Sequence, residues 1–216
     1  MTPTRKGGLP WQLIVGGLLI CSVVSLYAAF KAGMADLAVS QARWLVTQWQ
    51  KSPASMPADA EWKTAEAGHQ AALAWQPDDA EIKANLGYLY SLAANRPGLS
   101  AEQRHQALRQ ALEYQRQSLQ ARPMSGHGWS NTMVLMLALG ETGSEFWQSY
   151  DRAVAYGWRE DAIRQRIAQV CFVRWDEAGP ERQVQLRANI LSLPENLQAP
   201  LLRLAVQHGR YHLLKL

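Results

Sequence analysis

The stretch AEIKANLGYLYSL, residues 80–92, is followed by the loop AANRPGLS and then by AEQRHQALRQALEYQRQSLQARP, residues 101–123. Apolar and polar residues alternate in both segments with the spacing of amphipathic helices. A proline-glycine pair interrupts the loop, and the motif Ser-Ala-Glu-Gln at residues 100–103 matches a capping box that begins the second helix. The stretch therefore predicts two amphipathic helices with an irregular connection over residues 93–100.

Small and large residues recur along these helices at regular spacing, and weaker copies of the spacing flank them. The positions that carry this pattern are Ala65, His69, Ala72, Pro77, Leu86, Gly87, Tyr90, Ala111, Pro123, Trp129, Gly140, Tyr150 and Ala153, with Gly157-Trp158 in place of a last proline. Small residues allow paired helices to approach closely, and large residues fill the space between neighbouring pairs. One pair cannot bury its apolar face alone, so such units are expected to stack.

This spacing resembles the tetratricopeptide (TPR) repeat. The resemblance implies an all-α fold, with a degenerate TPR-like α-solenoid of antiparallel helix pairs over residues 60–158. The sequence departs from the repeat where Gln115 and Ser118 replace an aromatic and a small apolar residue. Ala111 also follows Tyr90 by 21 residues, against about nine in the repeat. We therefore expect an early, overlong second helix, and the role of loop 93–100 stays open.

An uncharged stretch near the N-terminus, WQLIVGGLLICSVVSLYAAF, covers the 20 residues 11–30. A helix of this length spans roughly 30 Å, the hydrocarbon thickness of a bilayer. Trp11 and Tyr27 lie near its ends, where amphipathic rings prefer the membrane interface. The stretch is longer than the apolar core of a cleaved signal peptide, and Cys21 does not follow the pattern of a lipoprotein. We therefore predict a single transmembrane helix at residues 11–30.

The charges beside this helix favour one orientation. Arg5 and Lys6 precede it and Lys31 follows it, which places the N-terminus, residues 1–10, in the cytoplasm. In a Gram-negative bacterium the rest of the chain would then lie in the periplasm, attached to the inner membrane. Without these three residues, 19 basic face 18 acidic residues, so the chain lacks the concentrated basic surface that nucleic-acid binding requires.

The remaining chain is expected to be helical throughout. Residues 31–59 form a juxtamembrane helix and a linker, with Leu37, Trp44 and Trp49 on one side of the helix, and Asp59 is expected to cap the next helix. Residues 159–216 form a C-terminal helical cap, with helices at 160–174, 180–192 and 198–208. The last of these helices is strongly apolar, and the tail after it is expected to pack back.

The sequence holds no motif for a hydrolase nucleophile, a phosphate loop, a dinucleotide site or a zinc protease. Glu66 with His69, and Glu102 with His105, each share one helical face and together supply half of a di-metal carboxylate site. No clear second glutamate pair faces them. His69 occupies an aromatic repeat position, Glu102 belongs to the capping box, and both cysteines lack metal-type spacing. We therefore assign no catalytic, cofactor or metal residues, and no enzymatic activity.

Two further features allow a ligand or a structural role. His127 lies in Ser125-Gly126-His127-Gly128, which reads as a turn before a helix. The tryptophans at positions 44, 49, 62 and 75 could line a sugar- or peptide-binding surface, but tryptophan is also the usual large filler of such repeats. Core packing is the preferred interpretation for the tryptophans, and a solvated turn for His127.

The order of parts also resembles the VpsP-like accessory proteins of bacterial exopolysaccharide synthesis and export. The resemblance rests on a short basic start, one span, degenerate repeats, and the segment from Arg122-Pro123 through Trp129 to Gly140. The resemblance implies a membrane-anchored scaffold that binds polysaccharide synthesis or export subunits. It assigns no site residues to this chain. An adaptor in cytochrome c maturation or in pilus or secretion assembly is the alternative, followed by a metal-dependent helical-bundle enzyme.

Overall fold

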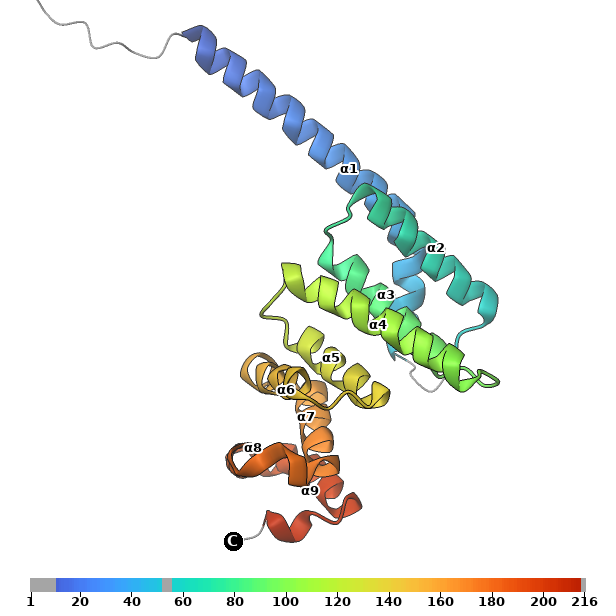
Figure 1. Cartoon of the computed structure of the whole chain (residues 1–216). Helices are drawn as coiled ribbons and strands as arrows, with labels where there is room; N and C mark the ends of the chain where they lie inside the picture. Colours follow the sequence, from blue (N-terminus) through green and yellow to red (C-terminus); the bar gives the residue numbers. More distant parts are fainter. Residues whose placement is uncertain (1–10, 52–55, 215–216) are drawn as a thin grey trace, which may run out of the picture. The chain divides into compact units, whose positions relative to one another are not determined.

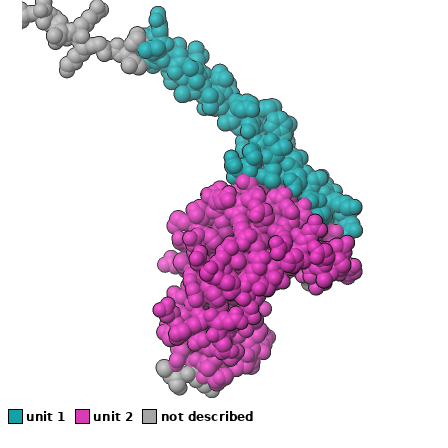
Figure 2. Space-filling view, viewed as in Figure 1, with its two compact units in different colours: residues 1–53, 57–78 teal, residues 54–56, 79–216 magenta. Residues whose placement is uncertain are grey.

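The computed structural model describes residues 11–51 and 56–214, which form nine α-helices and a short 3₁₀ turn with no strand (Figure 1). The all-α prediction is confirmed. The expected cytoplasmic segment, residues 1–10, lies outside the described residues. Two compact units divide the chain: α1 and α2 form unit 1, and α3 to α9 form unit 2 (Figure 2).

Unit 1 begins with α1 (Trp11–Lys51), one continuous helix whose two halves differ in burial. No residue between positions 11 and 30 is buried, and the described part of the chain contains one helix, α1, that is long and apolar enough to cross a membrane. The buried residues of α1 all lie in its second half: Ala35, Val39, Ala42, Leu45, Val46 and Trp49. Most of them follow alternating steps of four and three, so they form one narrow stripe.

This stripe packs against α2 (Asp59–Trp75), whose buried residues Trp62, Ala65, His69 and Ala72 repeat the same spacing. The two helices approach each other closely at Gly68. A Cβ atom built there would lie 2.8 Å from the Cβ of Ala42 and 3.0 Å from the carbonyl oxygen of Ala38. Small residues on both helices therefore set the distance between α1 and α2.

The side of α1 that carries Leu37, Trp44 and Trp49 is buried only in part. Leu37 and Trp44 remain 72% and 61% exposed, although Trp49 is buried as expected. The stripe of small residues faces α2 because it permits a closer approach than large side chains do. The predicted cap of α2 also differs, because Ala58 occupies the cap position and Asp59 is already the first helical residue.

Unit 2 opens with α3 (Ala80–Ala94) and α4 (Ala101–Ala121), which pack along each other. A Cβ at Gly87 would lie 2.7 Å from Nε2 of Gln115 and 3.1 Å from the carbonyl oxygen of Ala111. Gln115 Nε2 donates to the carbonyl of Ala84 at 3.1 Å, and Ser118 Oγ donates to that of Ala80 at 2.7 Å. The two polar residues that depart from the repeat pattern thus bond to the backbone of α3.

The capping box predicted at residues 100–103 is confirmed, and a side-chain cap also begins α3. Asp79 caps α3 by accepting from the backbone N–H groups of Glu81 and Ile82, and Ser100 forms a reciprocal capping box with Gln103. The helix after the loop is early and overlong as predicted, because α4 runs for 21 residues from Ala101.

The next pair consists of α5 (Gly126–Leu139) and α6 (Ser144–Gly157), and α5 also packs against α4. Gly140 ends α5 in the left-handed conformation, with φ of 76°. The backbones touch at the other end, where a Cβ on Gly126 would lie 2.6 Å from the Cα of Gly157. Only glycine leaves room for this contact.

The C-terminal part of unit 2 surrounds α7 (Asp161–Val173), which contacts α5, α6, α8 and α9. α8 (Trp175–Leu191) kinks at Gly179, next to the break that Gly179-Pro180 predicts. α9 (Glu195–Gln207) precedes a 3₁₀ turn at Tyr211–Leu213, after which Leu214 is 3% exposed. The predicted packing of the tail therefore holds for Leu213 and Leu214, whereas Tyr211 and His212 are exposed.

Candidate partner-binding surfaces

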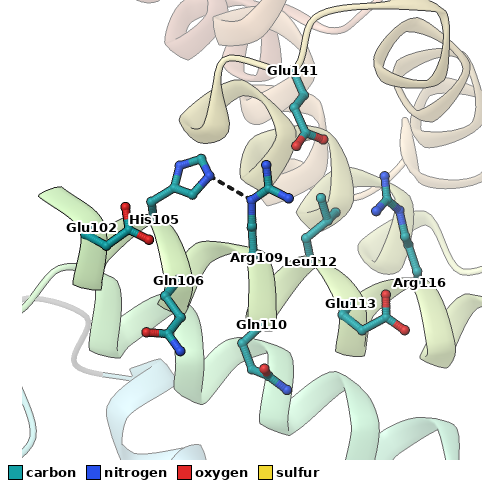
Figure 3. Close-up of a pocket in the computed structure, with 9 residues that line it drawn as sticks. All are labelled: Glu102, His105, Gln106, Arg109, Gln110, Leu112, Glu113, Arg116 and Glu141. Atoms are coloured by element: carbon teal, nitrogen blue, oxygen red, sulfur yellow. Dashed lines mark hydrogen bonds between the residues drawn. The ribbon is translucent and has the colours of Figure 1, made fainter.

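An open groove of about 790 Å³ lies along α4 (Figure 3). Most of its lining comes from α4, and one residue comes from the turn after α5. The lining residues are Glu102, His105, Gln106, Arg109, Gln110, Leu112, Glu113, Arg116 and Glu141. The early start of α4 contributes much of this surface. About three helical turns of α4 precede Ala111, the residue at the close contact with Gly87 of α3.

Both charge signs meet in this groove, which we call the α4 groove. Arg116 forms a two-pronged ion pair with Glu145, with N–O distances of 3.0 and 2.9 Å. Glu141 extends from the opposite wall toward the side of the groove that carries Arg109 and Leu112 (Figure 3). The mixed charges suit a polar protein surface, and none of the lining groups forms a cluster with an evident chemical task.

The Glu/His pairs singled out in the sequence do not form a metal centre. In α4, His105 Nε2 accepts a hydrogen bond of 2.7 Å from Arg109 Nε, so this nitrogen points at a cation (Figure 3). In α2, His69 is fully buried, and its Nδ1 donates to the carbonyl of Ala65 at 2.7 Å. Within residues 11–51 and 56–214, no group of three His, Cys, Asp or Glu side chains is placed to hold a metal ion.

A second, smaller hollow of about 180 Å³ is lined mainly by three helices of unit 2, and we call it the α3/α5/α7 hollow. Helix α3 contributes Tyr88 and Ser91, α5 contributes Asn131 and Val134, and α7 contributes Arg166. Gly87, Gln115 and Leu135 complete the lining. The close α3/α4 contact at Gly87 places Gln115 at the edge of the hollow.

Arg166 carries the charge of this hollow. Its guanidinium donates one hydrogen bond of 2.6 Å to Oδ1 of Asn131. No carboxylate lines the hollow, and no described carboxylate lies within ion-pair distance of Arg166. Burial lowers the pKa of Arg166 and raises that of Tyr88. An arginine that is partly removed from water, has free N–H donors and lacks a counter-ion favours an incoming anionic group.

Sequence reasoning missed Arg166 because the repeat pattern fades after residue 158. A signal was present, since Arg166 stands directly before Ile167 in a helix whose apolar residues Ile163, Ile167 and Val170 are all buried. A charged side chain beside such a stripe lies at the edge of a core. The partner across α5, Asn131, is identifiable only from the packing.

His127 and Cys171 each lie beside one other side chain. His127 lies in the first turn of α5, and not in the turn before a helix as predicted, with Nδ1 3.1 Å from Oε2 of Glu160. Cys171 is buried beside Tyr150, and burial raises its thiol pKa to about 11. A thiol with such a pKa is protonated at neutral pH and is a poor nucleophile.

The tryptophans divide between core and surface. Trp49 and Trp62 are buried, Trp75 is partly buried, and Trp44 is exposed. They do not line either the α4 groove or the α3/α5/α7 hollow.

Comparison with known proteins adds no relative. No family model matches the chain, and no curated protein matches it.

Proposed function

We propose that this chain is a membrane-anchored scaffold that binds protein partners in a bacterial envelope assembly and catalyses no reaction itself. The observation that carries this proposal is the contrast within α1. Residues 11–30 form an uncharged helical surface with no buried residue, while the second half of the same helix packs against α2. A bilayer is the environment that suits the uncovered half.

The partner surface in this proposal is the α3/α5/α7 hollow. An acidic side chain of a partner segment would pair with Arg166, and the donor groups beside it would fix the orientation of that side chain. The apolar side chain of Val134, which is 38% exposed, offers contact area next to the charge. The helix pairs α3/α4 and α5/α6, which pack through α4 and α5, support a TPR-like scaffold as the frame of this surface.

We place the chain in the inner membrane, with the N-terminus in the cytoplasm and unit 2 in the periplasm, because the charges beside the span favour this orientation. The resemblance to VpsP-like proteins points to exopolysaccharide synthesis or export subunits as the partners. In this role the scaffold holds the subunits together and needs no cofactor.

Photo-crosslinking in native membranes tests the proposal. A benzophenone amino acid at Val134 is expected to capture a partner, whereas the same group at Val184 of α8, which is 67% exposed, serves as the position control. Arg166→Gln should reduce capture from Val134 about tenfold, because one charge-assisted interaction is lost. Arg116→Gln removes an arginine that is already paired with Glu145 and should leave capture unchanged.

The identity of the crosslinked proteins distinguishes the alternative functions. Polysaccharide synthase or export subunits support the assembly named here, while haem-maturation or pilus subunits keep the scaffold and replace the assembly. Capture that is equal at both positions, or unaffected by Arg166→Gln, overturns the hollow as the contact surface. A purified chain with stoichiometric metal and no captured partner overturns the scaffold.

A further inference from the structure

The end of the uncovered half of α1 is marked by three residues of different chemistry. Tyr27 and Phe30 are 64% and 57% exposed, and Lys31 follows directly. The Nζ atom of Lys31 lies 5.9 Å from the centre of the Tyr27 ring. Tyrosine and lysine at this position mark the level where a bilayer meets water, because each has an apolar body and a polar end.

Helix α2 returns to this same level. The rings of Phe30 and Trp75 meet edge to face, with centroids 5.9 Å apart and an interplanar angle of 90°. Trp75 is the last residue of α2, Gln76 is its C-cap, and Pro77 and Asp78 form the turn that follows. The ring contact fixes the C-terminal end of α2 beside the last residue of the uncharged stretch.

We propose that the end of α2, Trp75 to Pro77, lies in the headgroup region of the bilayer and forms a second membrane contact. This inference rests on the proposed anchor. If residues 11–30 cross the membrane, Phe30 lies at the boundary, and Trp75 lies within one ring contact of it. The occupant of this surface is then the phospholipid bilayer itself, at the depth that amphipathic aromatic rings prefer.

The charges around this end define the kind of lipid. Lys31 supplies one positive charge, whereas the turn after α2 contains Asp78 and is followed directly by Asp79. This balance gives no basic cluster for anionic headgroups. The contact is therefore driven by the aromatic rings, and zwitterionic phosphatidylcholine suffices for it.

A second contact changes what the anchor does. With one span alone, the soluble part is free to pivot about the residues after Phe30. With both α1 and the end of α2 at the surface, the α1/α2 hairpin is held at two points. Its other end, at Asp59, stands about 25 Å along α2 from the bilayer, since α2 has 17 residues.

Depth measurement by spin labelling tests this placement on the full chain in phosphatidylcholine nanodiscs. Three single-cysteine variants carry a nitroxide, and all three contain Cys171→Ala. The first keeps native Cys21 as the labelled site. The other two add Cys21→Ser and carry the label at Gln76→Cys or at Lys63→Cys. Collisions with oxygen and with an aqueous nickel chelate report the depth. We expect Cys21 in the hydrocarbon, Gln76 at the headgroups and Lys63 in water, with nickel accessibility at Gln76 several-fold below that at Lys63.

The outcomes separate this inference from the anchor. A label at Gln76 as accessible to nickel as that at Lys63, with Cys21 still in the hydrocarbon, overturns the second contact and keeps the anchor. A Cys21 label in water overturns both. Trp75→Ala should raise nickel accessibility at Gln76 several-fold, whereas Trp44→Ala, which removes an exposed ring farther along α1, should not. Equal effects of the two substitutions also overturn the proposal.

Discussion

The two halves of α1 share one unbroken helix but differ in burial. Residues 11–30 are uncharged and mostly apolar, and none of them is buried. The second half includes charged residues, yet it buries a narrow stripe that includes Ala35, Val39 and Ala42. The comparison shows that apolar content alone does not identify the packed face of a helix. Burial against protein requires small residues that match a partner, whereas a bilayer accepts an apolar surface all round.

The largest expected effect comes from placing charge in the first half. Leu19→Arg combined with Val23→Arg puts two charges near the middle of the proposed span, at a cost of about 5–7 kcal/mol for insertion. The chain should disappear from the carbonate-washed membrane fraction.

The matched control places the same two charges in the second half, as Leu37→Arg with Trp44→Arg. These side chains are 72% and 61% exposed, and the variant should stay in the membrane. A first variant that remains membrane-bound would contradict the assignment of the two halves.

The two cysteines extend the comparison, because one is covered by protein and the other is proposed to be covered by lipid. A hydrophilic maleimide at pH 8 should label neither quickly in native membranes. Urea should then speed labelling of Cys171 about 1,000-fold by unfolding unit 2, and leave Cys21 in the bilayer unchanged. Cys21→Ser and Cys171→Ser assign the two signals. Rapid labelling of Cys21 without urea would contradict lipid protection.

The pKa of Cys171 gives this burial a pH signature. Its folded value is raised from 9.0 to about 11 because burial disfavours the thiolate. The protonated thiol therefore supports the folded state fully below pH 9, and this contribution is lost as the pH rises toward 11. Cys171→Ala should therefore reduce the fall in the free energy of unfolding at alkaline pH, measured by urea titrations between pH 8 and 11. An unchanged dependence of this free energy on pH would contradict the role of the buried thiol.

Much of the fold follows from short-range sequence signals. The caps at Asp79 and Ser100, the end of α5 at Gly140 and the break at Gly179 each involve neighbours within a few residues, so the sequence contains the whole interaction. The α3/α4 contact at Gly87 was also expected, because the repeat spacing places small residues there.

The α1/α2 contact and the Arg166 hollow could not be predicted in the same way. Ala42 and Gly68 carry little hydrophobic signal, and their importance appears only when the two helices meet. The hollow needs α3, α5 and α7 together, and the hydrogen bond from Arg166 to Asn131 crosses 35 residues. Interactions of this kind depend on tertiary packing, which periodicity alone does not specify.

The contact between α1 and α2 predicts a smaller effect, on stability. Gly68→Val forces a branched side chain against Ala42, where even a Cβ would lie at 2.8 Å. We expect a loss of about 2 kcal/mol in the free energy of unfolding, measured by urea titration of the detergent-solubilised chain. Gly33→Val is the control, because a Cβ at this helical glycine of α1 meets no atom within 4 Å. Equal losses in the two variants would contradict close packing at Gly68.

The smallest expected effect tests where along α1 the proposed span ends and the water-exposed half begins. Asp36 Oδ1 lies 2.7 Å from Arg43 Nη1, and the side chains of Asp36 and Arg43 are 69% and 43% exposed. In water such a pair is worth less than about 1 kcal/mol, so Asp36→Asn should change the free energy of unfolding by about 0.5 kcal/mol or less. Asp36 lies under two turns beyond Phe30 on the same helix. A loss well above 1 kcal/mol in nanodiscs would mean that lipid reaches Asp36, and the boundary between the halves would then lie farther along α1 than the aromatic residues indicate.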